Sequence, residues 1–278
     1  MNPDPRSETL RPEAIAAQAL AALDGRRQIA PFSETLPDFD LDLAYAVTAA
    51  LRKLREARGE RPVGRKIGFT NRTIWAEYNV HAPIWGDMYD TTVRALAESG
   101  DGLELAPFLE PRIEPEIAFG LARAPEPGMD EAALLGCVDW VAHGFEIVQS
   151  PYPEWRFAAA DTVAAFGLHG AYLVGPRQSI GGARAAGWLE ALASFEIALE
   201  RDGALIDRGH AADVLGGPLT ALRHLVELLA GDPLNPPLAA GEMVTTGTLT
   251  RAWPVAPGEA WRTAISGLPL DGIALRFA

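Results

Sequence analysis

The chain contains almost no cysteine. Only one of its 278 residues is a cysteine, Cys137, so an internal disulfide and a metal site built from several thiolates are both excluded. Cys137 stands in an apolar run, Ala132-Ala133-Leu134-Leu135-Gly136-Cys137-Val138, which indicates a packed thiol and not a nucleophile. The five histidines form no closely spaced pair, so the sequence gives little support for a zinc site.

Basic residues are also few. There are 24 lysines and arginines against 37 acidic residues, and the formal net charge is −13. This charge argues against nucleic acid or an anionic membrane surface as a partner, although a bound metal can still attract a small anionic molecule. No apolar run approaches about 18 residues, and no basic segment leads into an apolar one at the start. We therefore expect neither a transmembrane helix nor a signal peptide, and a cytoplasmic location by default.

Hydrophobic residues make up 48% of the chain and charged residues 22%, as in an ordinary globular protein. Apolar positions with helical spacing predict helices over 12–23 and 41–58, the second capped by Asp40. After Pro62, glycine and proline recur and short strands dominate, with Asp202-Gly203 as a hairpin turn. The strands are predicted at 63–69, 103–109, 112–121, 141–149, 169–175, 193–201, 204–209, 242–248 and 271–277. Further helices are predicted at 130–138, 158–165 and 218–230. The predicted fold is α+β, with a helical N-terminal segment at 1–62 and a strand-rich domain at 63–278.

Two glutamates stand two residues apart in the apolar run Pro111-Arg112-Ile113-Glu114-Pro115-Glu116-Ile117-Ala118-Phe119. On a strand, Glu114 and Glu116 share one face, and Ile113 and Ile117 point the other way. A hard cation such as Mg²⁺ or Mn²⁺ would relieve the repulsion between the two carboxylates. The alternative is an edge strand that presents a solvated acidic face.

Glu146 offers a third carboxylate within the apolar strand Gly144-Phe145-Glu146-Ile147-Val148. A carboxylate in such a strand is rarely buried without a partner. Together with Glu114 and Glu116 it would complete a three-carboxylate metal site. The alternative is again a glutamate on a solvated strand face.

A lysine stands between glycines in Gly64-Arg65-Lys66-Ile67-Gly68. Lys66 would share a strand face with the glycines, and Gly68 would let a ligand approach the backbone closely. We place Arg65 and Gly68 among the substrate-binding candidates and Lys66 among the catalytic ones. Asp87, in the aromatic-rich turn Trp85-Gly86-Asp87-Met88, is a candidate for proton transfer. A surface lysine and a turn aspartate are the alternatives.

Two further segments supply weaker signals. His169, between Leu168 and Gly170, is a candidate acid or base or a contact for a substrate carboxylate, with a plain loop histidine as the alternative. Thr246, in Thr245-Thr246-Gly247-Thr248, offers a hydroxyl beside backbone N–H groups that could hold a carboxylate.

The order of these motifs resembles the hydratase/decarboxylase branch of the fumarylacetoacetate hydrolase superfamily over roughly residues 40–260. The resemblance rests on the glutamate and Gly-Arg-Lys-Ile-Gly motifs together with shorter ones. These are Gly86-Asp87, Asp161-Thr162-Val163-Ala164, Leu215-Gly216-Gly217-Pro218-Leu219, Ala240-Gly241-Glu242 and Thr246-Gly247.

The resemblance implies the mixed, strand-rich β roll of the superfamily, in a homo-oligomer. It also implies Mg²⁺ or Mn²⁺ held by Glu114, Glu116 and Glu146, and a small 2-oxo acid or its dienol as substrate. Lys66 and Asp87 would serve in substrate binding and proton transfer.

One segment departs from the family. Where this branch tends to have Asp-Asn-Ala-Ser, the chain has Ala165-Phe166-Gly167-Leu168, followed by His169. Phe166 and Leu168 would replace a polar wall by an apolar one, so we place both among the substrate-binding candidates. The expected activity is a hydratase, with a decarboxylase second and a C–C hydrolase using His169 as base third. A non-catalytic metabolite-binding homologue is the alternative from another class.

Overall fold

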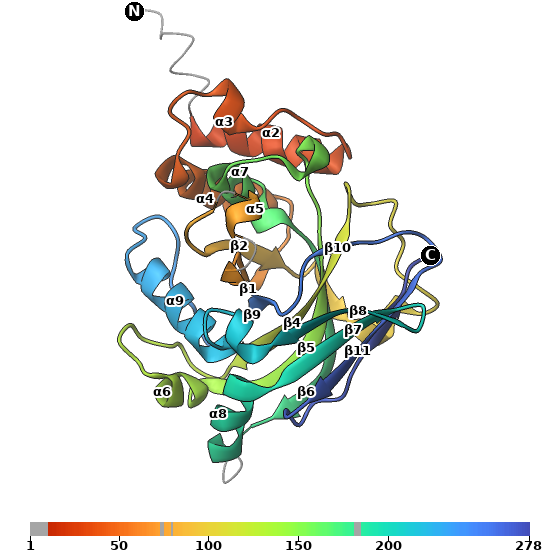
Figure 1. Cartoon of the computed structure of the whole chain (residues 1–278). Coiled ribbons are helices and arrows are strands. Elements are labelled where there is room, and N and C mark those ends of the chain that lie inside the picture. The colour runs from red at the N-terminus through yellow and green to blue at the C-terminus, as the bar shows by residue number, and fades with distance from the viewer. Residues whose placement is uncertain (1–10, 73–74, 79, 181–184) are drawn as a thin grey trace, which may run out of the picture.

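The structure is a computed structural model that describes residues 11–72, 75–78, 80–180 and 185–278. The first helices described are α2 (Pro12–Asp24), α3 (Phe32–Thr35) and α4 (Leu41–Ala57), which lie together at the top of Figure 1. Asp40 caps α4 by accepting a hydrogen bond from the amide of Leu43 at 2.9 Å. The two helices predicted near the N-terminus are therefore confirmed, including the cap.

A curled sheet fills the centre of the molecule. Its eight described strands run in the order β2-β1-β9-β4-β5-β6-β3, with β10 paired to β4 outside this path. Their bounds are β1 (Pro62–Gly68), β2 (Ile84–Tyr89), β3 (Val93–Ala95), β4 (Arg112–Leu121), β5 (Val138–Val148), β6 (His169–Ser179), β9 (Met243–Thr248) and β10 (Trp253–Pro254). The long strands β4 and β5 pair antiparallel over almost their whole length, so they form the rigid base of the fold.

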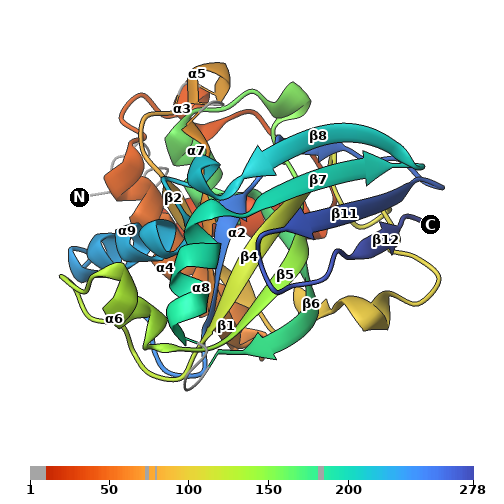
Figure 2. The same ribbon diagram turned by 60° about the horizontal axis from the view of Figure 1, so that its bottom comes forward.

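A second sheet lies across β4, β5 and β6, as Figure 2 shows. It has the order β12-β11-β7-β8, with bounds β7 (Glu196–Arg201), β8 (Ala204–His210), β11 (Ala260–Ser266) and β12 (Ala274–Arg276). Between the sheets, Ile113, Phe145 and Ile147 pack in one buried cluster with Leu199 and Trp261. The predicted turn at Asp202-Gly203 is confirmed, since both residues have positive φ (52° and 79°) as a two-residue hairpin turn requires.

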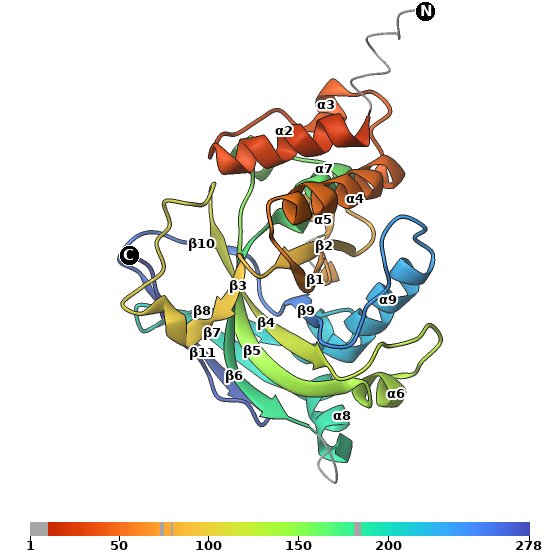
Figure 3. The same ribbon diagram turned by 180° about the vertical axis from the view of Figure 1, so that it is seen from behind.

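Helices cover the remaining faces. They are α5 (Trp75–Tyr78), α6 (Glu131–Leu135), α7 (Ala159–Ala164), α8 (Ala185–Ser194) and α9 (Pro218–Ala230), with short 3₁₀ segments η2 (Leu96–Ser99), η3 (Pro153–Trp155), η4 (Phe166–Leu168) and η6 (Ala211–Asp213). Val47 and Leu51 of α4 share a buried cluster with Val163 of α7 and Leu168 of η4. The N-terminal helices therefore pack directly on the segment that follows β5, at the top of Figure 3.

The α+β class and most predicted elements are confirmed, and one predicted strand is wrong. In the predicted strand 103–109, only Leu103 makes a sheet contact, a single bridge to Phe277, and turns follow it. Pro107 lacks an N–H group that a strand could use there. Several elements were not predicted, namely α3, α5, α8, β2, β3, β10 and β11. The division at residue 62 stays a prediction. Among the described residues, no helix is both long enough and apolar enough to cross a bilayer.

Candidate active site

Three glutamates meet on one face of the strand pair β4–β5. Glu114 lies directly opposite Glu146 in the strand register, and Glu116 lies opposite Gly144, as strand alternation predicts. Glu114 is 9% exposed, whereas Glu116 and Glu146 are fully buried. One carboxylate oxygen from each residue lies within 4.8 Å of the other two. The alternative of a solvated acidic face is therefore wrong.

The positively charged groups near the cluster do not balance the negative charge of its three carboxylates. Burial and the charge of Glu146 raise the pKa of Glu114 to about 7, although Lys66 opposes them. Burial, Glu146 and Glu114 raise the pKa of Glu116 well above its ordinary value. Burial also opposes ionisation of Glu146, but Lys66 and His169 outweigh it and lower the pKa of Glu146 to about 2. Three adjacent carboxylates thus cannot all ionise without a further positive charge.

The donor set fits a hard divalent cation. All three candidate ligands are carboxylates, the oxygen donors that Mg²⁺ and Mn²⁺ prefer. Within the described part of the chain, Glu116 Oε1 is buried and has no hydrogen-bond partner. The other oxygen, Oε2, accepts a hydrogen bond from the amide of Gly247 at 3.0 Å, which fixes the carboxylate. Residues 245–248 were predicted to bind a carboxylate, and in the structure the backbone amide of Gly247 binds that of Glu116.

Lys66 stands beside this cluster. Its Nζ lies 3.1 Å from Glu146 Oε2 and donates a hydrogen bond to the carbonyl of Gly167 at 3.0 Å. Burial lowers the pKa of Lys66, but the three carboxylates outweigh this effect and raise the pKa above its ordinary value. Gly86 makes the contact with the 166–168 segment possible, since a Cβ there would lie 2.5 Å from the carbonyl oxygen of Phe166.

His169 lies behind Glu146 and is not among the residues that line the pocket. Its Nδ1 is 2.8 Å from Glu146 Oε1, and its Nε2 is 2.9 Å from the hydroxyl oxygen of Thr92. Burial lowers the pKa of His169, although Glu146 partly offsets this effect, which favours the neutral ring. A neutral ring that faces a carboxylate must carry its proton on Nδ1, so Nε2 accepts from Thr92.

Asp87 and Arg65 lie away from the cluster. They are partners in the β1–β2 register, so both project from the face opposite to Lys66. Asp87 Oδ1 is 2.9 Å from Arg65 Nε, and Arg52 of α4 holds both Asp87 oxygens, at 2.6 and 3.0 Å. The structure therefore places Asp87 in a buried ion-pair network that ties α4 to β1 and β2.

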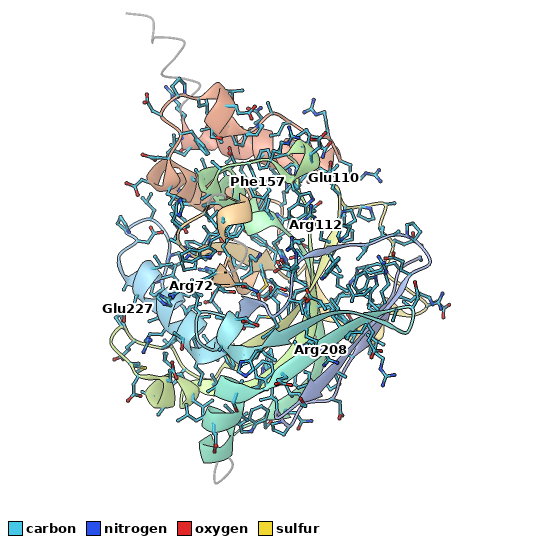
Figure 4. The ribbon with its side chains drawn as sticks, in the orientation of Figure 1. Arg72, Glu110, Arg112, Phe157, Arg208 and Glu227 are labelled. Atoms are coloured by element: carbon cyan, nitrogen blue, oxygen red, sulfur yellow. The ribbon has the colours of Figure 1, made fainter. Side chains whose placement is uncertain are left out.

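A pocket opens beside Lys66 and Glu114. Gly68 and Leu168, two of the substrate-binding candidates, line it, and their role stays a prediction. Phe166 and Thr246 do not line it: the Phe166 ring packs under the guanidinium of Arg55, and the Thr246 hydroxyl donates to the carbonyl of Ile117. The other lining residues are Ile67, Phe69, Ile84, Val148, Trp155, Phe157, Gly167, Thr248 and Ala252. Phe157 is labelled above Arg112 in Figure 4.

Several residues around the pocket have a left-handed backbone. Phe166, Gly167 and Leu168 have φ of 59°, 61° and 63°, and Phe69 and Trp155 have φ of 54° and 57°. This conformation costs a bulky residue about 1–2 kcal/mol. In η4 it turns the Gly167 carbonyl toward Lys66 and brings Leu168 into the pocket wall.

No sequence pattern points to Thr92, the Gly167 carbonyl, Phe69, Trp155 or Phe157 as parts of the site. They come from separate turns, and the fold alone brings them together. The unusual backbone at three of them is visible only in three dimensions.

No family model matches the chain. The chain is 31% identical over 252 residues to a 2-hydroxyhexa-2,4-dienoate hydratase of Comamonas testosteroni, covering 89% of this chain and 90% of the relative. It is 32% identical over 274 residues to a 2-keto-4-pentenoate hydratase of Paraburkholderia xenovorans, covering 96% and 94%.

The structure resembles a 4-oxalocrotonate decarboxylase from Pseudomonas putida G7, solved with magnesium and adipate. The TM-score is 0.84, the identity is 27%, and both chains are fully covered. A fumarylpyruvate hydrolase from Pseudomonas aeruginosa shares the fold at a TM-score of 0.54 and 14% identity, covering 78% of this chain and 89% of that one. With its glutamate cluster on the same strand-rich architecture, the chain belongs to the hydratase branch of the fumarylacetoacetate hydrolase superfamily.

Proposed function

We propose that the chain is a divalent-metal-dependent hydro-lyase that adds water to a small dienol of the 2-hydroxypenta-2,4-dienoate type. The observation that carries this proposal is the buried cluster of Glu114, Glu116 and Glu146 beside Lys66, since Glu114 and Lys66 also line a pocket. The near full-length similarity to relatives named as hydratases supports the same reaction.

Glu114, Glu116 and Glu146 would hold Mg²⁺ or Mn²⁺. When bound there, such an ion supplies positive charge that stabilises the enolate form of a 2-oxo acid. Magnesium in the structurally similar decarboxylase supports a divalent ion in this chain as well.

Hydration of the dienol requires proton transfers and one water. The C2 hydroxyl gives up its proton while C5 gains one, and water then adds at C4 while C3 gains a proton. Lys66 lines the pocket, and its Nζ lies 3.1 Å from Glu146 Oε2. We therefore assign its ammonium group to pair with the C1 carboxylate or to donate a proton.

Asp87 and His169 receive supporting roles in this proposal. Asp87 would fix the strand that carries Lys66 through its ion pairs to Arg52 and Arg65. His169 would orient Glu146 through Nδ1. Both residues would then act through another side chain and not on the substrate itself.

The test is turnover. Purified protein with Mg²⁺ should consume 2-hydroxypenta-2,4-dienoate, followed by the loss of dienol absorbance and by identification of the hydrated 2-oxo product. EDTA should abolish the reaction, and added Mg²⁺ should restore it. Full activity in EDTA would contradict the metal assignment, and an unchanged dienol would contradict the hydratase assignment.

A decarboxylase is the second candidate, favoured by the similarity to the 4-oxalocrotonate decarboxylase over the whole chain. The protein would release CO₂ from 2-oxohex-3-enedioate through the same enolate. CO₂ release without dienol hydration would replace the first assignment by this one.

C–C hydrolysis of an acylpyruvate and a non-catalytic binding role are the remaining alternatives. The first would need a base in the pocket, and His169 has both ring nitrogens engaged by Glu146 and Thr92. Turnover of any of these substrates would exclude the second. The homo-oligomeric state and the cytoplasmic location stay predictions, the former open to light scattering.

A further inference from the structure

The pocket beside Lys66 has one polar end and a long apolar wall. Lys66, Glu114 and Thr248 provide the polar side chains at one end. The wall is made by aromatic and aliphatic side chains from six different parts of the chain: Phe69, Ile84, Val148, Trp155, Phe157, Leu168 and Ala252. A substrate held by its 2-oxo acid group at the polar end would therefore extend its remaining carbons along apolar surface.

Three residues of this apolar wall have a strained backbone. Phe69, Trp155 and Leu168 all line the pocket, and all three have a left-handed backbone. Bulky residues rarely adopt this conformation, and strain of this kind gathers at ligand sites. These turns therefore fix the three apolar side chains in the wall of the pocket.

The pocket offers no partner for a second carboxylate. Of the described residues that line it, Lys66 is the only basic one, and it is already paired with Glu146. Arg112 stacks over the ring of Trp155 at 4.1 Å and does not line the pocket. A charged tail would thus lose its hydration without gaining an ion pair.

We infer that this enzyme selects a 2-oxo acid or dienol whose tail is apolar, such as a short alkyl or alkenyl chain, and that it rejects a tail ending in a carboxylate. The inference rests on the proposed function for the placement of the 2-oxo acid group at the polar end. It adds the chemical class of the tail, which the metal ligands do not determine.

The first test is a series of unreactive ligands titrated calorimetrically into the Mg²⁺-loaded protein. The series is pyruvate, 2-oxobutyrate, 2-oxopentanoate, 2-oxohexanoate and 2-oxoadipate. Each buried methylene should tighten binding by about fourfold. 2-Oxoadipate should bind at least about tenfold more weakly than 2-oxohexanoate, its matched analogue with a terminal methyl group. Equal affinities along the series, or tighter binding of 2-oxoadipate, would overturn the inference.

The second test is the variant Leu168→Asn. Asparagine tolerates a left-handed backbone, so the turn should persist while the wall becomes polar. Binding of 2-oxohexanoate should weaken by about tenfold, whereas pyruvate binding should change by less than about twofold. An equal loss for both ligands would contradict a role in tail selection.

Leu215→Asn is the matched control. Leu215 is also a buried leucine with a left-handed backbone (φ of 53°), and it lies outside the pocket lining. This variant should leave the ratio of the two affinities unchanged. A shift in that ratio as large as the one in Leu168→Asn would count against the inference.

These outcomes separate the inference from the proposed function. Ligand binding requires no turnover, so the affinity order can hold even if the dienol is not hydrated. In that case the reaction assignment fails and the apolar-tail site stands. If the dienol is hydrated but the affinity series is flat, only the tail inference fails.

Discussion

The Nδ1 atom of His169 lies 2.8 Å from Oε1 of Glu146, and both side chains are buried. The other ring nitrogen, Nε2, lies 2.9 Å from the hydroxyl oxygen of Thr92. The ring therefore has a defined orientation and a defined tautomer. Partners of this kind fix metal-binding carboxylates in place. If Glu146 binds the metal as proposed, His169 would help to determine the metal affinity.

Replacement of His169 by phenylalanine should therefore weaken metal binding by about 10- to 100-fold, the range found when a supporting partner is lost. Mn²⁺ binding followed by electron paramagnetic resonance measures this directly. Thr92→Val should have a smaller effect in the same direction, and Thr92→Ser, which keeps the hydroxyl, should have almost none. Normal Mn²⁺ affinity in His169→Phe would contradict the positioning role.

Glu116→Gln should weaken metal binding more than His169→Phe does. The substitution removes one of three buried carboxylates, so Mn²⁺ affinity should fall by more than the 10- to 100-fold expected of an outer partner. In EDTA the same variant should be more stable than the wild type, because repulsion within the cluster is relieved. Urea unfolding tests the second statement, and a less stable metal-free variant would be evidence against an uncompensated cluster.

The metal-free protein should lose stability as the pH rises through the titration of Glu114. Its pKa is 4.5 ordinarily and about 7 in the fold, so between these values the folded protein keeps a proton that the unfolded chain releases. The stabilising contribution is complete below pH 4.5 and is lost as the pH approaches 7. At about 1.4 kcal/mol per pH unit, the loss reaches roughly 3 kcal/mol.

The comparison with Glu114→Gln isolates this effect from other titrating groups. In EDTA, the variant should gain stability relative to the wild type between pH 5 and pH 8, measured by urea unfolding. Mg²⁺ should stabilise the wild type increasingly over the same range, since it binds the ionised carboxylates. A difference between the two proteins that stays constant with pH would show that Glu114 titrates normally.

Asp87→Asn should mainly reduce stability. Asp87 and Arg65 are buried and paired, and Arg52 holds the same carboxylate, so the substitution leaves buried guanidinium groups without their partner. Breaking such a pair costs about 3–5 kcal/mol. Asp90→Asn is the control, since Asp90 pairs with the largely exposed Arg61 and should cost far less. Loss of all activity with unchanged stability would instead support proton transfer by Asp87.

The carboxylate cluster could be predicted from the sequence because local rules position it. Glu114 and Glu116 are two residues apart, so any strand places them on one face. Glu146 joins them because its strand, β5, pairs with β4 over a long antiparallel stretch. Likewise the helices at 12–23 and 41–58 were visible in their spacing and caps.

The position of Asp87 could not be predicted in this way. Whether it joins Lys66 depends on the β1–β2 register, which pairs Asp87 with Arg65 and Lys66 with Gly86. A shift of one residue would reverse the two faces. The left-handed turn at 166–168 also has no sequence signature, since only one of its three residues is a glycine.

The origin of the pocket residues has a consequence for how such an enzyme can diversify. The carboxylates are carried by the long central strands, whereas Phe69, Trp155, Phe157 and Leu168 are carried by turns and short segments outside them. Turns accept substitutions and insertions more readily than a central sheet does. Related enzymes can therefore change the substrate tail that they prefer while they keep the carboxylate cluster.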